Sequence, residues 1–181
     1  MRSINYWSLL VIFSLGLAGC NVTFPQVDSA ISAVRSQLAK QSELPRSPEI
    51  RWSASFKGEG RLMRAFTENG LTLFVSEEED AIAFDGWVVR SLGGFGDSSI
   101  LSIIDTGNAR RYKSRAAYEA PDPTQCGNWT NSKNEGGNVV WRQVCNRNDE
   151  PNSITLNQQG LIVAIDQVVD SDGNRLSLRK L

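Results

Sequence analysis

Three cysteines carry the most reactive side chains of this 181-residue chain. Cys20 ends a short apolar stretch near the N-terminus, whereas Cys126 and Cys145 lie far downstream. Cysteine thiols can be acylated, oxidised in pairs or bound to a metal. The chain contains no histidine, so it cannot by itself build a Ser-His-Asp triad, a Cys-His dyad or a histidine-ligated metal centre. Catalysis would have to use paired carboxylates, a lysine or a tyrosine.

The segment Leu17-Ala18-Gly19-Cys20 resembles the lipobox of bacterial lipoproteins. Arg2 precedes the apolar run Trp7–Leu17, which has the length of a secretory h-region and is too short to span a bilayer. The resemblance implies that the Cys20 thiol is acylated and that residues 1–19 are removed as a lipoprotein signal peptide. The alternative is an ordinary signal peptide that is cut near Ala18 or Gly19.

An acylated Cys20 would hold the chain firmly on a membrane, because each buried CH₂ group contributes about 0.8 kcal/mol and the new amino group would carry a further acyl chain. Asn21 follows Cys20, whereas the inner-membrane retention signal of enteric lipoproteins is typically Asp at this position. We therefore expect the membrane as a partner through the lipid anchor. The expected location is the bacterial outer membrane, on its periplasmic face.

An exported chain meets an oxidising compartment, so we expect Cys126 and Cys145 to form a disulfide. Two buried free thiols are the alternative. A zinc site is disfavoured because two cysteines without histidine make a poor ligand set, and no cofactor is expected. With 19 basic and 20 acidic residues, the chain has no global positive field, so nucleic acid is not an expected partner.

The remaining length is typical of one domain with one core. We predict a lipidated tether at residues 20–26 and a single β-rich periplasmic domain at residues 27–181. Apolar residues recur with helical spacing through Val27–Gln41, at Val27, Ala30, Ile31, Val34 and Leu38, with Asp28 as N-cap. This pattern predicts one amphipathic helix that packs on its own domain; a helix that binds a partner is the alternative.

From Ile50 onward the hydrophobic period becomes that of strands. Asn69-Gly70, Asp85-Gly86 and Asp172-Gly173 predict β-hairpin turns. The predicted strands are Ile50–Phe56, Arg61–Thr67, Leu71–Ser76, Ala81–Phe84, Trp87–Leu92, Ser99–Asp105, Arg111–Glu119, Asn138–Cys145, Ser153–Leu156, Leu161–Val169 and Arg175–Lys180. Pro121–Lys133 is predicted to be irregular. The expected fold is mainly β, an antiparallel curved sheet in a half-barrel or a sandwich, with one N-terminal amphipathic helix.

Two charged segments could bind ligands. Glu77-Glu78-Glu79-Asp80 could hold calcium, but it suits a solvated turn better because calcium loops usually alternate their ligands around a glycine bend. Arg110, Arg111, Lys113 and Arg115 form a local basic patch, and strand alternation places Arg111, Lys113 and Arg115 on one possible anionic-ligand face. A solvated sheet face is the alternative for these three residues. The glycine-rich Leu92–Asp97 indicates a turn or bulge rather than a nucleotide site.

The remaining candidate residues are tryptophans that could bind sugars and carboxylates that could hydrolyse glycans. Trp52, Trp87, Trp129 and Trp141 could stack on sugar rings or fill the core, and the core is favoured. Glycan hydrolysis would need two of Glu59, Glu68, Asp85 and Asp105 to converge in a groove.

The segment Asp85-Gly86-Trp87-Val88-Val89-Arg90-Ser91-Leu92-Gly93-Gly94 resembles a motif of the YjbF/GfcB family of group 4 capsule polysaccharide lipoproteins. The acylated N-terminus, the Cys126/Trp129 and Trp141/Cys145 pairs, and the terminal strand pair also agree with that family. Ser91 stands where threonine is common, and Thr155 or Leu156 replaces a frequent tryptophan.

This resemblance implies a non-enzymatic envelope lipoprotein that assists capsule or exopolysaccharide production or export, with polysaccharide or export-machinery proteins as partners. A lipid or acyl-chain carrier with an apolar cavity and a carboxylate-dependent glycan hydrolase are the alternatives.

Overall fold

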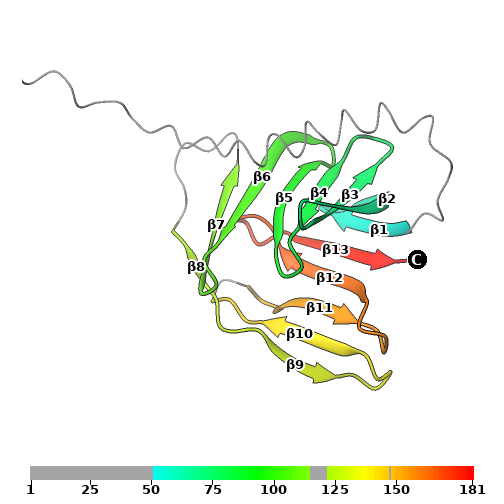
Figure 1. The fold of residues 1–181 in the computed structure, drawn as a ribbon. Coiled ribbons are helices and arrows are strands. Elements are labelled where there is room, and N and C mark those ends of the chain that lie inside the picture. The colour runs from blue at the N-terminus through cyan, green and yellow to red at the C-terminus, as the bar shows by residue number, and fades with distance from the viewer. Residues whose placement is uncertain (1–50, 115–121, 147) are drawn as a thin grey trace, which may run out of the picture.

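The computed structural model describes residues 51–114, 122–146 and 148–181. Thirteen antiparallel strands form one sheet that curls into a half-barrel (Figure 1). The mainly β half-barrel prediction is confirmed, and the predicted helix Val27–Gln41 lies outside the described residues. Within the described ranges, no helix has the length and apolar character needed to cross a membrane.

The strands follow the order of the chain. They are β1 (Arg51–Phe56), β2 (Glu59–Glu68), β3 (Leu71–Ser76), β4 (Ala81–Phe84), β5 (Val89–Gly94), β6 (Asp97–Asp105), β7 (Ala109–Ser114), β8 (Thr124–Gln125), β9 (Thr130–Lys133), β10 (Val139–Gln143), β11 (Asn152–Leu156), β12 (Ile162–Val168) and β13 (Arg175–Lys180).

The topology is two meanders joined back to back. The sheet order is β8-β7-β6-β5-β4-β3-β2-β1-β13-β12-β11-β10-β9, so β1 and β13 meet at the centre and the two edges are β8 and β9. These two edge strands are also sequence neighbours, linked by residues 126–129 alone. Such a short link spans at most roughly 17 Å. The sheet must therefore curl until its two edges approach each other.

The concave face of the sheet holds the main core. Strand alternation points one set of side chains inward. These side chains form a single buried cluster, with members from β7 at one end of the sheet order to β11 near the other. Its largest members include Trp52, Phe74, Phe84 and Met63, and Trp52 packs edge-on against Phe74 with ring centroids 5.1 Å apart. Side chains therefore fill the interior of the half-barrel.

All three predicted hairpin turns join antiparallel neighbouring strands, and the first of them is a two-residue turn. Asn69 and Gly70 both have positive φ, at 49° and 79°, and they join β2 to β3 as a two-residue turn. Lys57-Gly58, which was not predicted, joins β1 to β2 in the same way.

Asp85-Gly86 and Asp172-Gly173 also lie in β-hairpin connections, as predicted, but in loops longer than two residues. Residues 85–88 form a longer loop in which Asp85 Oδ1 accepts hydrogen bonds from the Trp87 and Val88 amides. Asp172-Gly173 lies in a similarly longer loop, where Asp170 accepts from the Asp172 and Asn174 amides. In both loops an aspartate side chain adds hydrogen bonds to a backbone closure, which the Asp85 amide makes with the Val88 carbonyl and the Val169 amide with the Asn174 carbonyl. The predicted strand start at Trp87 is wrong, because β5 begins at Val89.

Two short strands contradict the irregular segment predicted at Pro121–Lys133. β8 has only two residues, and all four residues of β9 are exposed. Neither strand shows the apolar alternation by which a half-buried strand is predicted. β9 forms because its backbone pairs with β10, from Thr130 opposite Arg142 to Lys133 opposite Val139.

The glycine-rich segment between β5 and β6 forms a bulge followed by a tight turn, as predicted. The register shifts between Leu92 and Gly94, and Phe95 and Gly96 turn the chain with φ of 55° and 73°. Phe95 is buried in this left-handed conformation, and its amide donates to Asp80 Oδ1 at 2.5 Å. Ser76 Oγ and Arg61 Nε also donate to the buried Asp80 carboxylate. This turn therefore depends on close packing against Asp80.

Gly94→Ala should lower the free energy of unfolding by about 2–4 kcal/mol. Gly94 has a φ of 93°, and an added Cβ would lie 2.8 Å from the Asp80 Cα, a backbone atom that cannot rotate away. Gly93→Ala is the matched control, because its Cβ would meet Ile100 Cγ1 at an ordinary 3.6 Å and its φ is not in the left-handed region. Urea unfolding of both variants measures the difference, and equal stabilities would contradict this description of the turn.

Candidate functional site

The two ends of the curled sheet are tied together at a seam, which comprises residues 124–127 and 143–146. A disulfide joins Cys126 to Cys145, as predicted. On either side of it, the Gly127 amide donates to the Val144 carbonyl at 2.8 Å and the Asn146 amide donates to the Gln125 carbonyl at 2.9 Å. The seam thus links the segment after β8 covalently to the segment after β10.

A buried arginine reinforces the seam from inside. Arg110 on β7 is fully buried, and its Nη2 donates to Gln143 Oε1 on β10 at 2.6 Å. Gln143 Nε2 in turn donates to the Gly127 carbonyl at 3.0 Å. Asp105 Oδ2 lies 3.4 Å from Arg110 Nε and supplies the opposite charge that a buried guanidinium requires. Burial lowers the pKa of Arg110 below its usual value, and the Asp105 carboxylate opposes that effect.

Arg110 therefore does not belong to the surface patch predicted from the sequence. β7 alternates so that Arg110 and Tyr112 are buried, whereas Arg111 and Lys113 are exposed. Arg111 and Lys113 do share one face, as expected, but Arg115 lies outside the described residues, as does Cys20. The role of Arg111, Lys113 and Arg115 as an anionic-ligand face stays a prediction.

A second buried side chain spans the concave face. Gln167 on β12 is fully buried; its Oε1 accepts from the Val89 amide at 3.1 Å, and its Nε2 donates to the Trp87 carbonyl at 2.7 Å. Arg90 Nε on β5 donates to Asp85 Oδ2 at the start of the loop 85–88 at 2.6 Å. These bonds fix the loop 85–88 from both ends and so determine where the Trp87 indole lies.

Three tryptophans meet next to the seam and form the tryptophan cluster, which comprises Trp87, Trp129 and Trp141. The Trp87 ring centroid lies 5.5 Å from that of Trp129 and 5.1 Å from that of Trp141. The Arg110 guanidinium lies 5.9 Å from the Trp129 ring. Trp129 and Trp141 are half-buried, whereas Trp87 remains 44% exposed. Trp52, the fourth predicted tryptophan, fills the core instead.

The tryptophan cluster offers flat apolar surface beside polar groups. Asn131 on β9 lies directly opposite Trp141 in the strand register and is exposed, so a hydrogen-bonding side chain borders the indoles. Exposed aromatic surface with a polar rim is typical of a binding site rather than of a solvated face. The indoles also come from three separate segments fixed by the seam and by Gln167, so the surface is preorganised.

The acidic candidates are arranged differently. Glu77, Glu78 and Glu79 are exposed, whereas Asp80 is buried among the hydrogen bonds at the β5–β6 turn. Across the described ranges, no three Cys, Asp or Glu side chains gather as metal ligands. Of the four carboxylates named for hydrolysis, three are held in ion pairs by an arginine: Glu59 by Arg61, Asp85 by Arg90, and Asp105 by Arg110.

The fold resembles that of a solved lipoprotein structure. The crystal structure of the hypothetical lipoprotein YmcC from Escherichia coli K12 aligns with a TM-score of 0.52 and 10% identical residues, over 85% of this chain and 93% of that chain. No family model matches the sequence, and no curated protein matches it. At this identity the likeness shows a common fold.

Removing the disulfide by Cys126→Ser with Cys145→Ser should lower the free energy of unfolding by about 3 kcal/mol, because the unfolded chain regains the entropy of an open loop. Chemical unfolding measures this loss, and reduction of the unmodified protein is the matched control that should give the same value. Unchanged stability would mean that the seam does not depend on the disulfide.

Tyr112 should make the protein less stable in alkali. Burial raises the pKa of its phenol above the usual 10.0, and the Arg110 cation opposes part of that rise. Below pH 10.0 the phenol is neutral in both the folded and the unfolded protein. Just above this pH the unfolded chain releases the phenol proton, whereas the folded chain keeps it. The free energy of unfolding should therefore begin to fall as the pH rises through the usual phenol pKa of 10.0 and should keep falling above it.

Tyr112→Phe removes the titrating group and should flatten part of that fall. At neutral pH the variant should stay within about 0.5 kcal/mol of the unmodified protein, because the buried Tyr112 hydroxyl makes no hydrogen bond. Identical pH slopes for the two proteins would show that Tyr112 does not contribute.

Proposed function

We propose that this chain is a lipid-anchored envelope protein that assists the production or export of a capsule polysaccharide or exopolysaccharide by binding it, without an enzymatic step. The observation that carries the proposal is the tryptophan cluster: three indoles held next to the seam, with Trp87 44% exposed. The resemblance of Asp85–Gly94 to the capsule lipoprotein family supports it, and Trp87 lies inside that segment.

The tryptophan cluster suits a sugar chain for two physical reasons. An indole face is apolar and flat and matches the C–H face of a pyranose ring, while the indole edge and neighbouring amides meet the hydroxyl groups. Asn131 supplies such an amide beside Trp141. The cluster also has little freedom to lose on binding, because Gln167 holds the Trp87 carbonyl and the disulfide holds the chain near Trp129.

The anchor is proposed from the N-terminal sequence. Cys20 in its lipobox would be acylated, and Asn21 after it favours the periplasmic face of the outer membrane over retention at the inner membrane. YmcC, which shares the fold, is itself described as a hypothetical lipoprotein. A polysaccharide-binding domain tethered in this way would meet its polymer close to the membrane that the polymer crosses.

Neither alternative function fits the described residues as well. A carrier of acyl chains needs an apolar cavity, but the concave face is filled by buried side chains such as Phe74, Phe84 and Met63. A carboxylate-dependent hydrolase needs two convergent acids free to act on a glycosidic bond. Asp85 and Asp105, the candidates that lie nearest the tryptophan cluster, are each bound to an arginine.

Trp87→Ala, introduced into the gene in the bacterium that carries it, should lower the amount of surface polysaccharide. Loss of a central aromatic contact weakens binding by about tenfold or more, and deletion of the whole gene should have the same or a larger effect. Quantifying extracted surface polysaccharide measures both.

Leu161→Ala is the matched control, because Leu161 is a large exposed apolar residue at 54% and is not part of the tryptophan cluster. It should leave the polysaccharide unchanged, and Trp87→Phe should keep part of the activity. A normal amount of surface polysaccharide in the deletion strain would overturn the proposed function. A lower amount in the deletion strain but a normal amount in the Trp87→Ala strain would show that the tryptophan cluster is not the binding site.

A further inference from the structure

A second apolar cluster lies on the outer face of the sheet, away from the core. This outer cluster comprises Leu73 and Val75 on β3 and Ala83 on β4, with Phe66 and Leu71 packed against it. Its three central side chains alternate with the core residues Phe74 and Ile82 and therefore point to the convex side. All thirteen strands belong to one sheet, so the described residues provide no second layer over this face.

The outer cluster is nevertheless not a solvated surface. The exposed fractions of Leu73, Val75 and Ala83 are only 4%, 3% and 5%. Side chains on the open face of a single antiparallel sheet are ordinarily polar and wet. An apolar set at this position needs a partner that removes it from water, and that partner must itself present an apolar surface.

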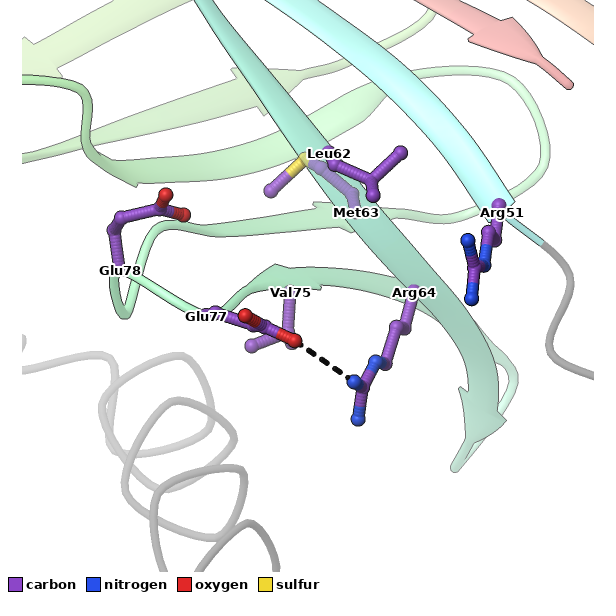
Figure 2. A pocket seen from close by; sticks show the side chains of 7 residues that line it. All are labelled: Arg51, Leu62, Met63, Arg64, Val75, Glu77 and Glu78. Carbon is purple, nitrogen blue, oxygen red and sulfur yellow. Dashed lines mark hydrogen bonds and ion pairs between the residues drawn. The ribbon is translucent and has the colours of Figure 1, made fainter. Parts of the chain in front are cut away.

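A hollow of about 220 Å³ adjoins the outer cluster at Val75. It is lined by Arg51 from β1, Leu62 and Arg64 from β2, and Glu77 and Glu78 from the turn after β3. Figure 2 shows Arg64 and Glu77 reaching toward each other across it, with their charged atoms 3.0 Å apart. Leu62, which lines the hollow, is 53% exposed. An apolar strip thus runs beside a rim that carries both signs of charge.

We propose that the segment Val27–Gln41 of this same chain packs as a helix on the outer cluster and covers β2, β3 and β4 from the convex side. The predicted apolar stripe of that segment, with Val27, Ile31, Val34 and Leu38, provides the matching surface. Arg35 is next to the stripe on a helical projection and would supply a charge opposite to that of Glu77 and Glu78 on the rim.

The chain length permits this docking. Arg51 lines the hollow and also begins β1, so the chain enters the described fold beside the outer cluster. Residues 42–50 link Gln41 to Arg51 and can extend to about 30 Å, while a helix over Val27–Gln41 is about 22 Å long. The segment can therefore lie along the outer face and return to β1 without strain.

The docked helix would orient the domain. Only residues 21–26 separate Cys20 from Val27, so the face formed by β2–β4 would lie next to the membrane if Cys20 is acylated. The docking itself does not depend on the proposed function or on acylation.

Thiol labelling of Ala83→Cys tests the docking. The mature chain, residues 20–181, is used with Cys20→Ser, so that the introduced cysteine is the one free thiol beside the Cys126–Cys145 disulfide. In this protein a maleimide should react slowly with Cys at position 83. Adding Val34→Asp, which places a charge in the apolar stripe, should speed the reaction by about tenfold or more.

Ser36→Asp is the matched control, because it adds the same charge on the opposite side of the helix and should leave labelling slow. Tryptophan fluorescence of each variant reports that the domain is folded. Fast labelling without Val34→Asp, in this lipid-free solution, would overturn the proposal and indicate a membrane as the cover. Slow labelling that is lost on dilution would overturn it in favour of a second copy of the chain. Equal slow labelling with Val34→Asp and Ser36→Asp would also overturn it.

Discussion

The short link between the two edge strands determines the shape of this protein. β8 and β9 stand at opposite ends of a thirteen-stranded sheet, yet only residues 126–129 connect them. A flat sheet of this width would separate its edges by several times the reach of that link. The sheet therefore curls, and the Cys126–Cys145 disulfide and the Arg110–Gln143 hydrogen bond hold the approaching ends together.

The same closure explains why polar side chains are buried near the seam. Two strand ends that meet without full backbone pairing leave carbonyl and amide groups that water can no longer reach. Gln143 satisfies the Gly127 carbonyl, and Gln167 satisfies the Trp87 carbonyl and the Val89 amide. The exposed edge that remains, β9, is short and polar with Lys133 at its end, which protects it from pairing with other chains. Between these fixed points lies the tryptophan cluster.

Much of the fold could be predicted from the sequence, because strand alternation and turn residues are local signals. Asn69-Gly70 specified its turn, and strands such as Leu71–Ser76 and Ala81–Phe84 have the predicted bounds. β8 and β9 could not be predicted, because long-range pairing rather than their own composition makes them strands. Arg110 was counted in the local basic patch because its neighbours are basic, whereas the strand register of β7 places it opposite Asp105 in the interior. The sequence shows each tryptophan separately, but only the curl of the sheet brings Trp87, Trp129 and Trp141 together.

The proposed function depends on sugar contact at the tryptophan cluster, and an NMR titration of the indole N–H signals tests it most directly. Oligosaccharides cut from the surface polysaccharide of the bacterium would be added to the protein. The Trp87 signal should shift until it saturates, the Trp129 and Trp141 signals should follow, and the signal of Trp52, buried in the core, should stay unmoved. Saturating oligosaccharide that moves none of the cluster signals would contradict the account.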